Sequence, residues 1–158
     1  MSYQPPPPTL ELLYRASIAV DKPQLFGPTP QASGERRIIN ITGGEFGGAK
    51  LRGKILPGGA DWQIIRTDAV AQLEARFTMQ TDDGALLYVR NFGFRHGAPE
   101  VIARLFSGEV VDPAEYYFRM TPIIETGDAR YAWLNSLIMV GSGMRTKDRV
   151  IYDVYAVN

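Results

Sequence analysis

The sequence places a carboxylate directly beside an indole at Asp61 and Trp62, just after the turn-forming residues Pro57-Gly58-Gly59. An aspartate held in an apolar pocket has a raised pKa and can act as a general acid or base near neutral pH. The same residues also suit a structural interpretation, in which Asp61 caps a turn and Trp62 fills the core. Residue types and spacing favour the structural interpretation, so proton transfer by Asp61 is a hypothesis.

A second carboxylate, Glu125, is close in sequence to several aromatic residues. Two carboxylates that flank a substrate perform glycoside cleavage, but the sequence gives no distance between Asp61 and Glu125. Core or subunit packing is the alternative role for the aromatic residues. The candidate catalytic residues are therefore Asp61 and Glu125, and the candidate ligand-binding residues are Trp62, Tyr88, Arg119 and Trp133.

Arginine side chains on two predicted strands could bind a carboxylate or an enolate, because a guanidinium group donates two parallel hydrogen bonds. Arg76 shares one strand face with Glu74, and Arg119 lies on another strand. For the first face a solvated position is favoured, since the opposite face carries Leu73, Ala75, Phe77 and Met79. The alternation around Arg119 does not decide whether its side chain points into the barrel or towards solvent.

Several classes of site are excluded by composition. The chain has no cysteine and one histidine, which removes thiol nucleophiles, iron–sulfur clusters and metal sites with several imidazoles. Gly48–Lys54 matches the start of a phosphate-binding loop, but Ile55 replaces the required hydroxyl residue. His96 could be the general base of a serine hydrolase, but the sequence contains no Gly-x-Ser-x-Gly motif to supply the nucleophile. We expect neither a metal nor an organic cofactor.

Charge and hydropathy also limit the partners. Seventeen basic residues balance seventeen acidic ones, so we expect no general electrostatic attraction to nucleic acid or to an anionic membrane. No secretory signal or membrane-spanning stretch is recognisable, and a cytoplasmic location is expected.

The elements that position these residues are predicted to be mostly strands. Gly and Pro contribute 16 and 11 residues, spread along the chain between short β-branched and aromatic runs. The clearest pattern is a hairpin of Leu73–Gln80 and Leu86–Phe94 around Asp82-Asp83-Gly84, and Pro99–Phe106 has helical spacing. Further strands are predicted at residues 10–20, 35–41, 49–56, 61–66, 116–126, 132–140 and 150–157, with an irregular segment at residues 23–33.

Eight or more antiparallel strands with one short helix favour a closed or nearly closed barrel, because closure removes exposed sheet edges. A β-sandwich is the alternative. We expect one domain over residues 9–158, preceded by a flexible proline-rich arm at residues 1–8, in which Pro5–Pro8 prefers polyproline II.

Five segments together resemble the DUF3237 family, a domain of unknown function found in bacteria and fungi. They are Leu56–Gln63, Thr81–Gly84, Tyr117–Pro122, Glu125–Gly127 and Tyr131–Asn135. The resemblance covers about Leu10 to Val157. It implies a calycin-like antiparallel β-barrel of about eight to ten strands with a short helix, commonly as a homo-oligomer. It implies no established activity; some fungal members sit in natural-product pathways, which suggests a small organic ligand.

Two functions remain open on these grounds. The first is a barrel pocket for a small, partly apolar, oxygenated metabolite, with or without cofactor-free acid/base chemistry of the isomerase, lyase or hydratase type. The second is a non-catalytic structural or interaction module that forms a homo-oligomer. A cavity beside a buried carboxylate would favour the pocket, and a filled barrel would favour the module.

Overall fold

The computed structural model describes residues 3–158, and within them ten strands form one antiparallel sheet. The strands are β1 (Leu10–Val20), β2 (Gln24–Thr29), β3 (Gly34–Gly47), β4 (Arg52–Ile55), β5 (Ala60–Arg66), β6 (Ala71–Thr81), β7 (Leu86–Gly97), β8 (Tyr116–Glu125), β9 (Met139–Arg145) and β10 (Arg149–Val157). The helical segments are α1 (Pro99–Phe106) and the short 3₁₀ segments η1 (Pro113–Glu115) and η2 (Ala129–Ser136).

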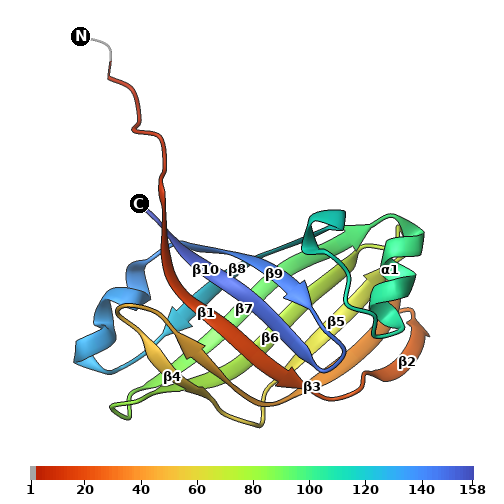
Figure 1. Cartoon of the computed structure of the whole chain (residues 1–158), viewed down its shortest axis with the longest axis horizontal. Helices are drawn as coiled ribbons and strands as arrows, with labels where there is room; N and C mark the ends of the chain where they lie inside the picture. Colours follow the sequence, from red (N-terminus) through yellow and green to blue (C-terminus); the bar gives the residue numbers. More distant parts are fainter. Residues whose placement is uncertain (1–2) are drawn as a thin grey trace.

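The sheet closes on itself (Figure 1). Its strand order is β1-β10-β9-β8-β7-β6-β4-β3-β2, and β1 also pairs with β3. β4 and β5 both lie between β3 and β6, at different points along them. Gly59 directly precedes β5, at a point where a Cβ atom would collide with the Arg76 carbonyl oxygen, so only glycine permits this close approach. The closed antiparallel barrel with a short helix confirms the predicted fold class.

Closure divides every strand into an inward and an outward set of side chains. In β8, Tyr116, Phe118 and Met120 are buried while Tyr117 and Arg119 are exposed. The core also contains fully buried side chains from other strands, among them Tyr14, Met79, Leu87, Val89 and Val154. The solvated face predicted for Glu74 and Arg76 is confirmed, since both are exposed on β6.

Helical segments cover the two ends of the barrel, α1 at one end and η2 at the other (Figure 1). α1 has the predicted bounds, begins with Pro99 in its first turn and buries Val101 and Leu105. η2 buries Leu134 almost completely. Both helical segments therefore contribute apolar side chains to the core.

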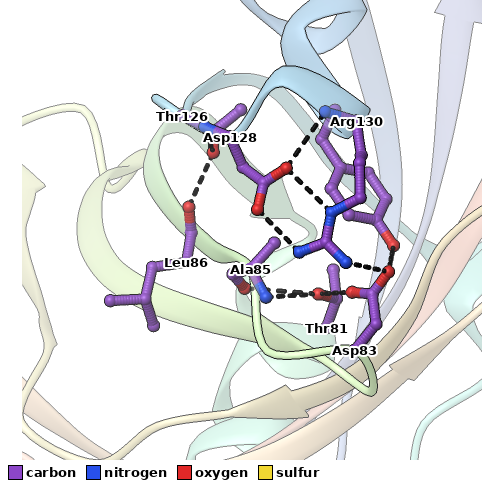
Figure 2. Close-up of polar contacts among 8 residues, drawn as sticks. Thr81, Asp83, Ala85, Leu86, Thr126, Asp128 and Arg130 are labelled. Carbon is purple, nitrogen blue, oxygen red and sulfur yellow. Dashed lines mark hydrogen bonds and ion pairs between the residues drawn. The ribbon is translucent and has the colours of Figure 1, made fainter.

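A polar network attaches η2 to the turn between β6 and β7 (Figure 2). The guanidinium of Arg130 pairs with Asp83 at 3.0 Å and with Asp128 at 2.7 Å. The hydrogen bond from Arg130 lowers the pKa of Asp128 to about 2. The hydroxyl of Thr126 donates to the Leu86 carbonyl at 2.8 Å. We name this set of residues, together with Thr81 and Asn135, the η2 clamp.

Asn135 completes the η2 clamp through the backbone of Thr126. Its Oδ1 accepts from the Thr126 N–H and its Nδ2 donates to the Thr126 carbonyl, both at 2.9 Å. Three of the segments that carry the family resemblance, Thr81–Gly84, Glu125–Gly127 and Tyr131–Asn135, contribute to this clamp. Their role in the structure is to hold one end of the barrel.

Three predicted elements were wrong. Residues 132–140 are not one strand: η2 ends at Ser136 and β9 begins at Met139, because the clamp and the Asp128 cap on the Arg130 N–H stabilise a 3₁₀ segment. Residues 23–33 contain the strand β2, which pairs only with β3, so Pro28 is tolerated on an edge. The strand predicted at residues 49–56 is the shorter β4, Arg52–Ile55.

The proline-rich arm leaves the barrel at Thr9, whose N–H and carbonyl both pair with the backbone of Asn158. Residues 3–8 are exposed, have no regular secondary structure, and extend away from the barrel (Figure 1). Residues 1–2 of the predicted arm lie outside the described residues. The predicted flexibility of the arm stays a prediction.

Across residues 3–158 we found no helix with the length and apolar character that a bilayer crossing requires.

The η2 clamp predicts the effect of Asn135→Ala. Loss of the two bonds to Thr126 should lower the free energy of unfolding by about 1 kcal/mol, since a net hydrogen bond contributes roughly 0.5–1.5 kcal/mol and the site is exposed. Urea denaturation followed by tryptophan fluorescence measures this change. Lys22→Ala, a change of an exposed residue outside the clamp, should leave the midpoint unaltered; equal midpoints for both variants would show that the clamp does not stabilise the fold.

Candidate functional site

The interior of the barrel contains a cavity of about 50 Å³ that is partly open to solvent. Most of its wall is apolar, formed by side chains such as Ile18, Ile41, Phe77, Phe118 and Val150. The polar members of the wall are Asp61, Asn91, Arg95, Arg145 and Tyr152. Since a water molecule needs roughly 10–15 Å³ of such space, the cavity has room for a few water-sized groups.

Asp61 reaches this cavity because β5 alternates. Asp61 and the buried Gln63 point inward, whereas Trp62 between them is exposed on the outer face. The carboxylate accepts hydrogen bonds from the Glu74 N–H at 2.9 Å and from Gln63 Nε2 at 3.1 Å. Backbone pairing between β5 and β6 is interrupted at Trp62 and Gln63, and within this interruption the Asp61 side chain accepts from the Glu74 N–H. Asp61 thus combines a structural contact with a position in the cavity wall.

Burial raises the pKa of Asp61 above its ordinary value of 3.8. The hydrogen bond from Glu74 opposes this increase, as do the positive charges of Arg95 and Arg145 and the contact with Gln63. A carboxylate with a raised pKa in an apolar cavity can donate or accept a proton at a pH where an exposed aspartate cannot.

Arg95 is the most deeply buried charged side chain of the cavity. It lies near the end of β7 on the inward face, is 8% exposed, and its guanidinium carbon is 5.7 Å from the centre of the Phe118 ring. Burial lowers its pKa to about 10, so the side chain stays positively charged at neutral pH. Its Nη1 has no hydrogen-bond partner among residues 3–158. A buried guanidinium with an unused donor is costly unless a further group binds it.

Arg145 adds a second positive charge at the end of β9. Burial also lowers its pKa, and its backbone N–H donates to the Tyr116 hydroxyl at 3.1 Å. Within residues 3–158, neither Arg95 nor Arg145 has a carboxylate oxygen within 4.0 Å of its nitrogens. One carboxylate therefore faces two arginines without direct contact, and the cavity carries a net positive charge.

A third arginine lies beside the cavity but is already paired. The Arg37 side chain contacts Glu35 at 3.0 Å and lies 4.7 Å from the centre of the Phe106 ring at the end of α1. Its positive charge still acts on the cavity, because it contributes to lowering the pKa of both Arg95 and Arg145.

The structure does not bring the other predicted site residues into this cavity. Trp62, Tyr88 and Arg119 are exposed on the outer faces of β5, β7 and β8. Glu125 is exposed at the end of β8, and Trp133 is exposed on η2, at the opposite end of the barrel from α1. For the four residues on strands, the outward position follows from strand alternation, in which a buried neighbour such as Phe118 or Ile124 takes the inward place.

Sequence reasoning missed Asn91, Arg95, Arg145 and Tyr152. Leu87 and Val89 mark the inward face of β7, and continuing that alternation reaches Asn91 and Arg95. The predicted strand stopped at Phe94 and so excluded Arg95. Arg145 was missed because the strand was predicted at residues 132–140, whereas β9 extends to Arg145.

Comparison with known proteins shows close similarity along almost the full length. UPF0311 protein RPA1785 of Rhodopseudomonas palustris is 45% identical over 150 residues, which covers 95% of this chain and 98% of the relative. Its crystal structure, described as a conserved protein of unknown function, matches with a TM-score of 0.91 at 40% identity, covering 98% of this chain and all of that one.

Two further structures have the same architecture. A beta-barrel like protein of Acinetobacter baumannii matches with a TM-score of 0.86 and 44% identity, covering 99% of this chain and 100% of the other. The structure of an enzyme from Penicillium herquei matches with a TM-score of 0.73 over the whole of both chains, but at 18% identity this likeness shows the fold alone. The family model "Protein of unknown function (DUF3237)" matches residues 8–157, and the chain belongs to that family.

Proposed function

We propose that the protein binds a small, partly apolar organic anion inside the barrel, with a carboxylate or enolate group held between Arg95 and Arg145. The observation that carries the proposal is the buried Arg95 guanidinium, whose Nη1 lacks a partner at a cavity that already contains a carboxylate. Guanidinium groups bind planar oxyanions through two hydrogen bonds, and the apolar wall suits a short hydrocarbon portion. The unfilled interior favours this function over a purely structural module.

Asp61 is the proposed proton-transfer group of the same pocket. Its carboxylate lines the cavity, and burial raises its pKa. A ligand oxyanion that neutralises Arg95 and Arg145 would also remove much of the positive charge that opposes this rise, so the pKa of Asp61 should increase further on binding. The reaction type that fits is proton transfer at carbon or oxygen next to the bound oxyanion, as in an isomerase, lyase or hydratase. No cofactor is needed for such a step.

Replacement of Arg95 tests the binding proposal. Arg95→Met should abolish binding of small carboxylates and raise the free energy of unfolding of the ligand-free protein by about 1–4 kcal/mol, because an unpaired buried charge is removed. The probes are acetate and propionate, titrated against the melting temperature. Saturating ligand should raise the wild-type melting temperature by several degrees.

Arg90→Gln is the matched control, since Arg90 lies on the same strand but is exposed on the outer face. It should retain both carboxylate binding and wild-type stability. If Arg95→Met instead destabilises the protein strongly, Arg95 is a structural charge and the proposal fails. Absence of any carboxylate effect on the wild type would also contradict it.

The raised pKa of Asp61 predicts a characteristic pH dependence of stability. A carboxyl group whose pKa is raised by folding stabilises the protein below its unfolded pKa of about 3.8, and this contribution is lost as the pH rises through the folded pKa. Asparagine does not titrate, and its Oδ1 can still accept from the Glu74 N–H. The melting temperature of Asp61→Asn relative to wild type should therefore become more favourable between pH 4 and pH 7.

Asp68→Asn provides a control of opposite sign. The hydrogen bond from Arg66 lowers the pKa of Asp68, so its stabilising contribution is present at neutral pH and is lost on acidification. This variant should become less stable relative to wild type as the pH rises. A pH trend of Asp61→Asn that matches Asp68→Asn in sign would show that Asp61 is a stabilised anion and not a proton donor.

A further inference from the structure

A groove of about 390 Å³ crosses the outer surface of the barrel, and Gly93 and Met120 line both this groove and the interior cavity. Its floor lies over the junction of β8 and β9, whose paired residues are limited to Arg119 with Ser142 and Met120 with Gly141. Its walls are rich in aromatic side chains from β7, β8 and β10, namely Phe92, Phe94, Tyr117 and Tyr155. Phe92 and Tyr117 remain 41% and 45% exposed. The Tyr117 ring stacks on His96 with 4.8 Å between ring centres, and the Arg119 guanidinium carbon is 5.5 Å from the Tyr117 ring centre, so Phe92 offers the more open aromatic surface.

The groove borders the base of the proline-rich arm. Leu10 is the first residue of β1, lines the groove and is 61% exposed. The arm, residues 3–8, is exposed throughout and contains Pro5–Pro8. A run of prolines prefers the polyproline II helix of about 3.1 Å per residue, so these six residues extend roughly 19 Å. The molecule therefore presents a stiff, apolar segment next to an aromatic groove.

Polyproline II segments and aromatic grooves are chemically complementary. Proline rings pack against aromatic faces, and the preformed polyproline II conformation lowers the entropic cost of binding. A run of prolines offers carbonyl acceptors but no N–H donors. The groove offers donors to such carbonyls in the Arg119 guanidinium and the hydroxyl groups of Tyr117, Ser142 and Tyr155. Arg119, exposed on the outer face, has a place in this groove and not in the interior cavity.

The arm is directed away from the groove of its own barrel. Thr9 is fixed by two backbone hydrogen bonds with Asn158, of 2.8 Å and 2.9 Å. A reversal directly before Thr9 would need a sharp bend at Pro8, where the proline ring fixes φ and restricts the preceding residue to extended conformations. The arm extends from the barrel without returning to it (Figure 1).

We propose that the arm of one molecule binds in the outer groove of a second copy of this chain, and that reciprocal exchange of arms builds a two-fold symmetric dimer. Two arms then act together, so that each engaged arm raises the effective concentration of the other. Exposed Leu10 and Leu12 at the base of each arm add apolar surface beside the exchanged segment.

Sedimentation velocity on the full chain tests the exchange, from low to high micromolar concentration. The wild type should sediment as a dimer. A variant with Pro5→Ser, Pro6→Ser, Pro7→Ser and Pro8→Ser keeps the length of the arm but loses its stiffness and ring contacts, and its dimer dissociation constant should rise by about tenfold or more. Leu25→Ser, at an equally exposed apolar position on β2 away from the groove, should remain dimeric.

A peptide of residues 3–9 tests the groove itself. The labelled peptide should bind the four-serine variant, and Tyr117→Ala or Phe92→Ser added to that variant should each weaken binding by about tenfold. Circular dichroism checks that the variants fold. Two separate wall positions are replaced so that the test still works if one variant does not fold. Three outcomes would each overturn the proposal: a monomeric wild type, an unchanged dimer dissociation constant in the four-serine variant, or peptide binding that neither wall variant weakens. Binding of the peptide with a monomeric wild type would place the arm in its own groove.

Discussion

Pairing of β1 with β3 is the constraint on which the rest of the structure depends. It converts a ten-stranded sheet into a barrel and thereby divides the side chains of the closing strands between a packed interior and a solvated surface. A polar group that points inward is largely removed from bulk water, so its burial is costly unless it has a partner there. Asp61, Arg95 and Arg145 line this interior, and burial there shifts the pKa of each of them.

Within the enclosure, charge is distributed unevenly. Several arginines outside the cavity are paired closely with carboxylates, as Arg130 is with Asp83 and Asp128 in the η2 clamp. In the cavity two arginines face one aspartate that is engaged by Glu74 and Gln63 instead. A fold that only required stability would gain from apolar residues at these places. The imbalance therefore supports a function that depends on positive charge inside the barrel.

Much of the fold could be predicted from the sequence, because strand alternation and turn residues act locally. The hairpin of β6 and β7 and the helix α1 were recognisable from period-two alternation, an Asp-Gly turn and an N-terminal proline. η2 could not be predicted, because it depends on Asn135 binding the backbone of Thr126 across a turn. Asp61 was a candidate because of its local context, and its side chain lines the cavity. The inward direction of Arg95 depends on where β7 ends, which a one-dimensional pattern does not define.

The η2 clamp also bears on how this family is recognised. Three of the five distinctive sequence segments hold one end of the barrel and contribute nothing to the cavity wall, whereas Asp61 is the one charged cavity residue within such a segment. These five segments include neither Arg95 nor Arg145, so a match to this signature identifies the scaffold and does not by itself define the charge of the interior. Proteins that share the signature can therefore differ in the charge of their interiors, and each member's ligand has to be inferred from its own barrel lining and not from its membership.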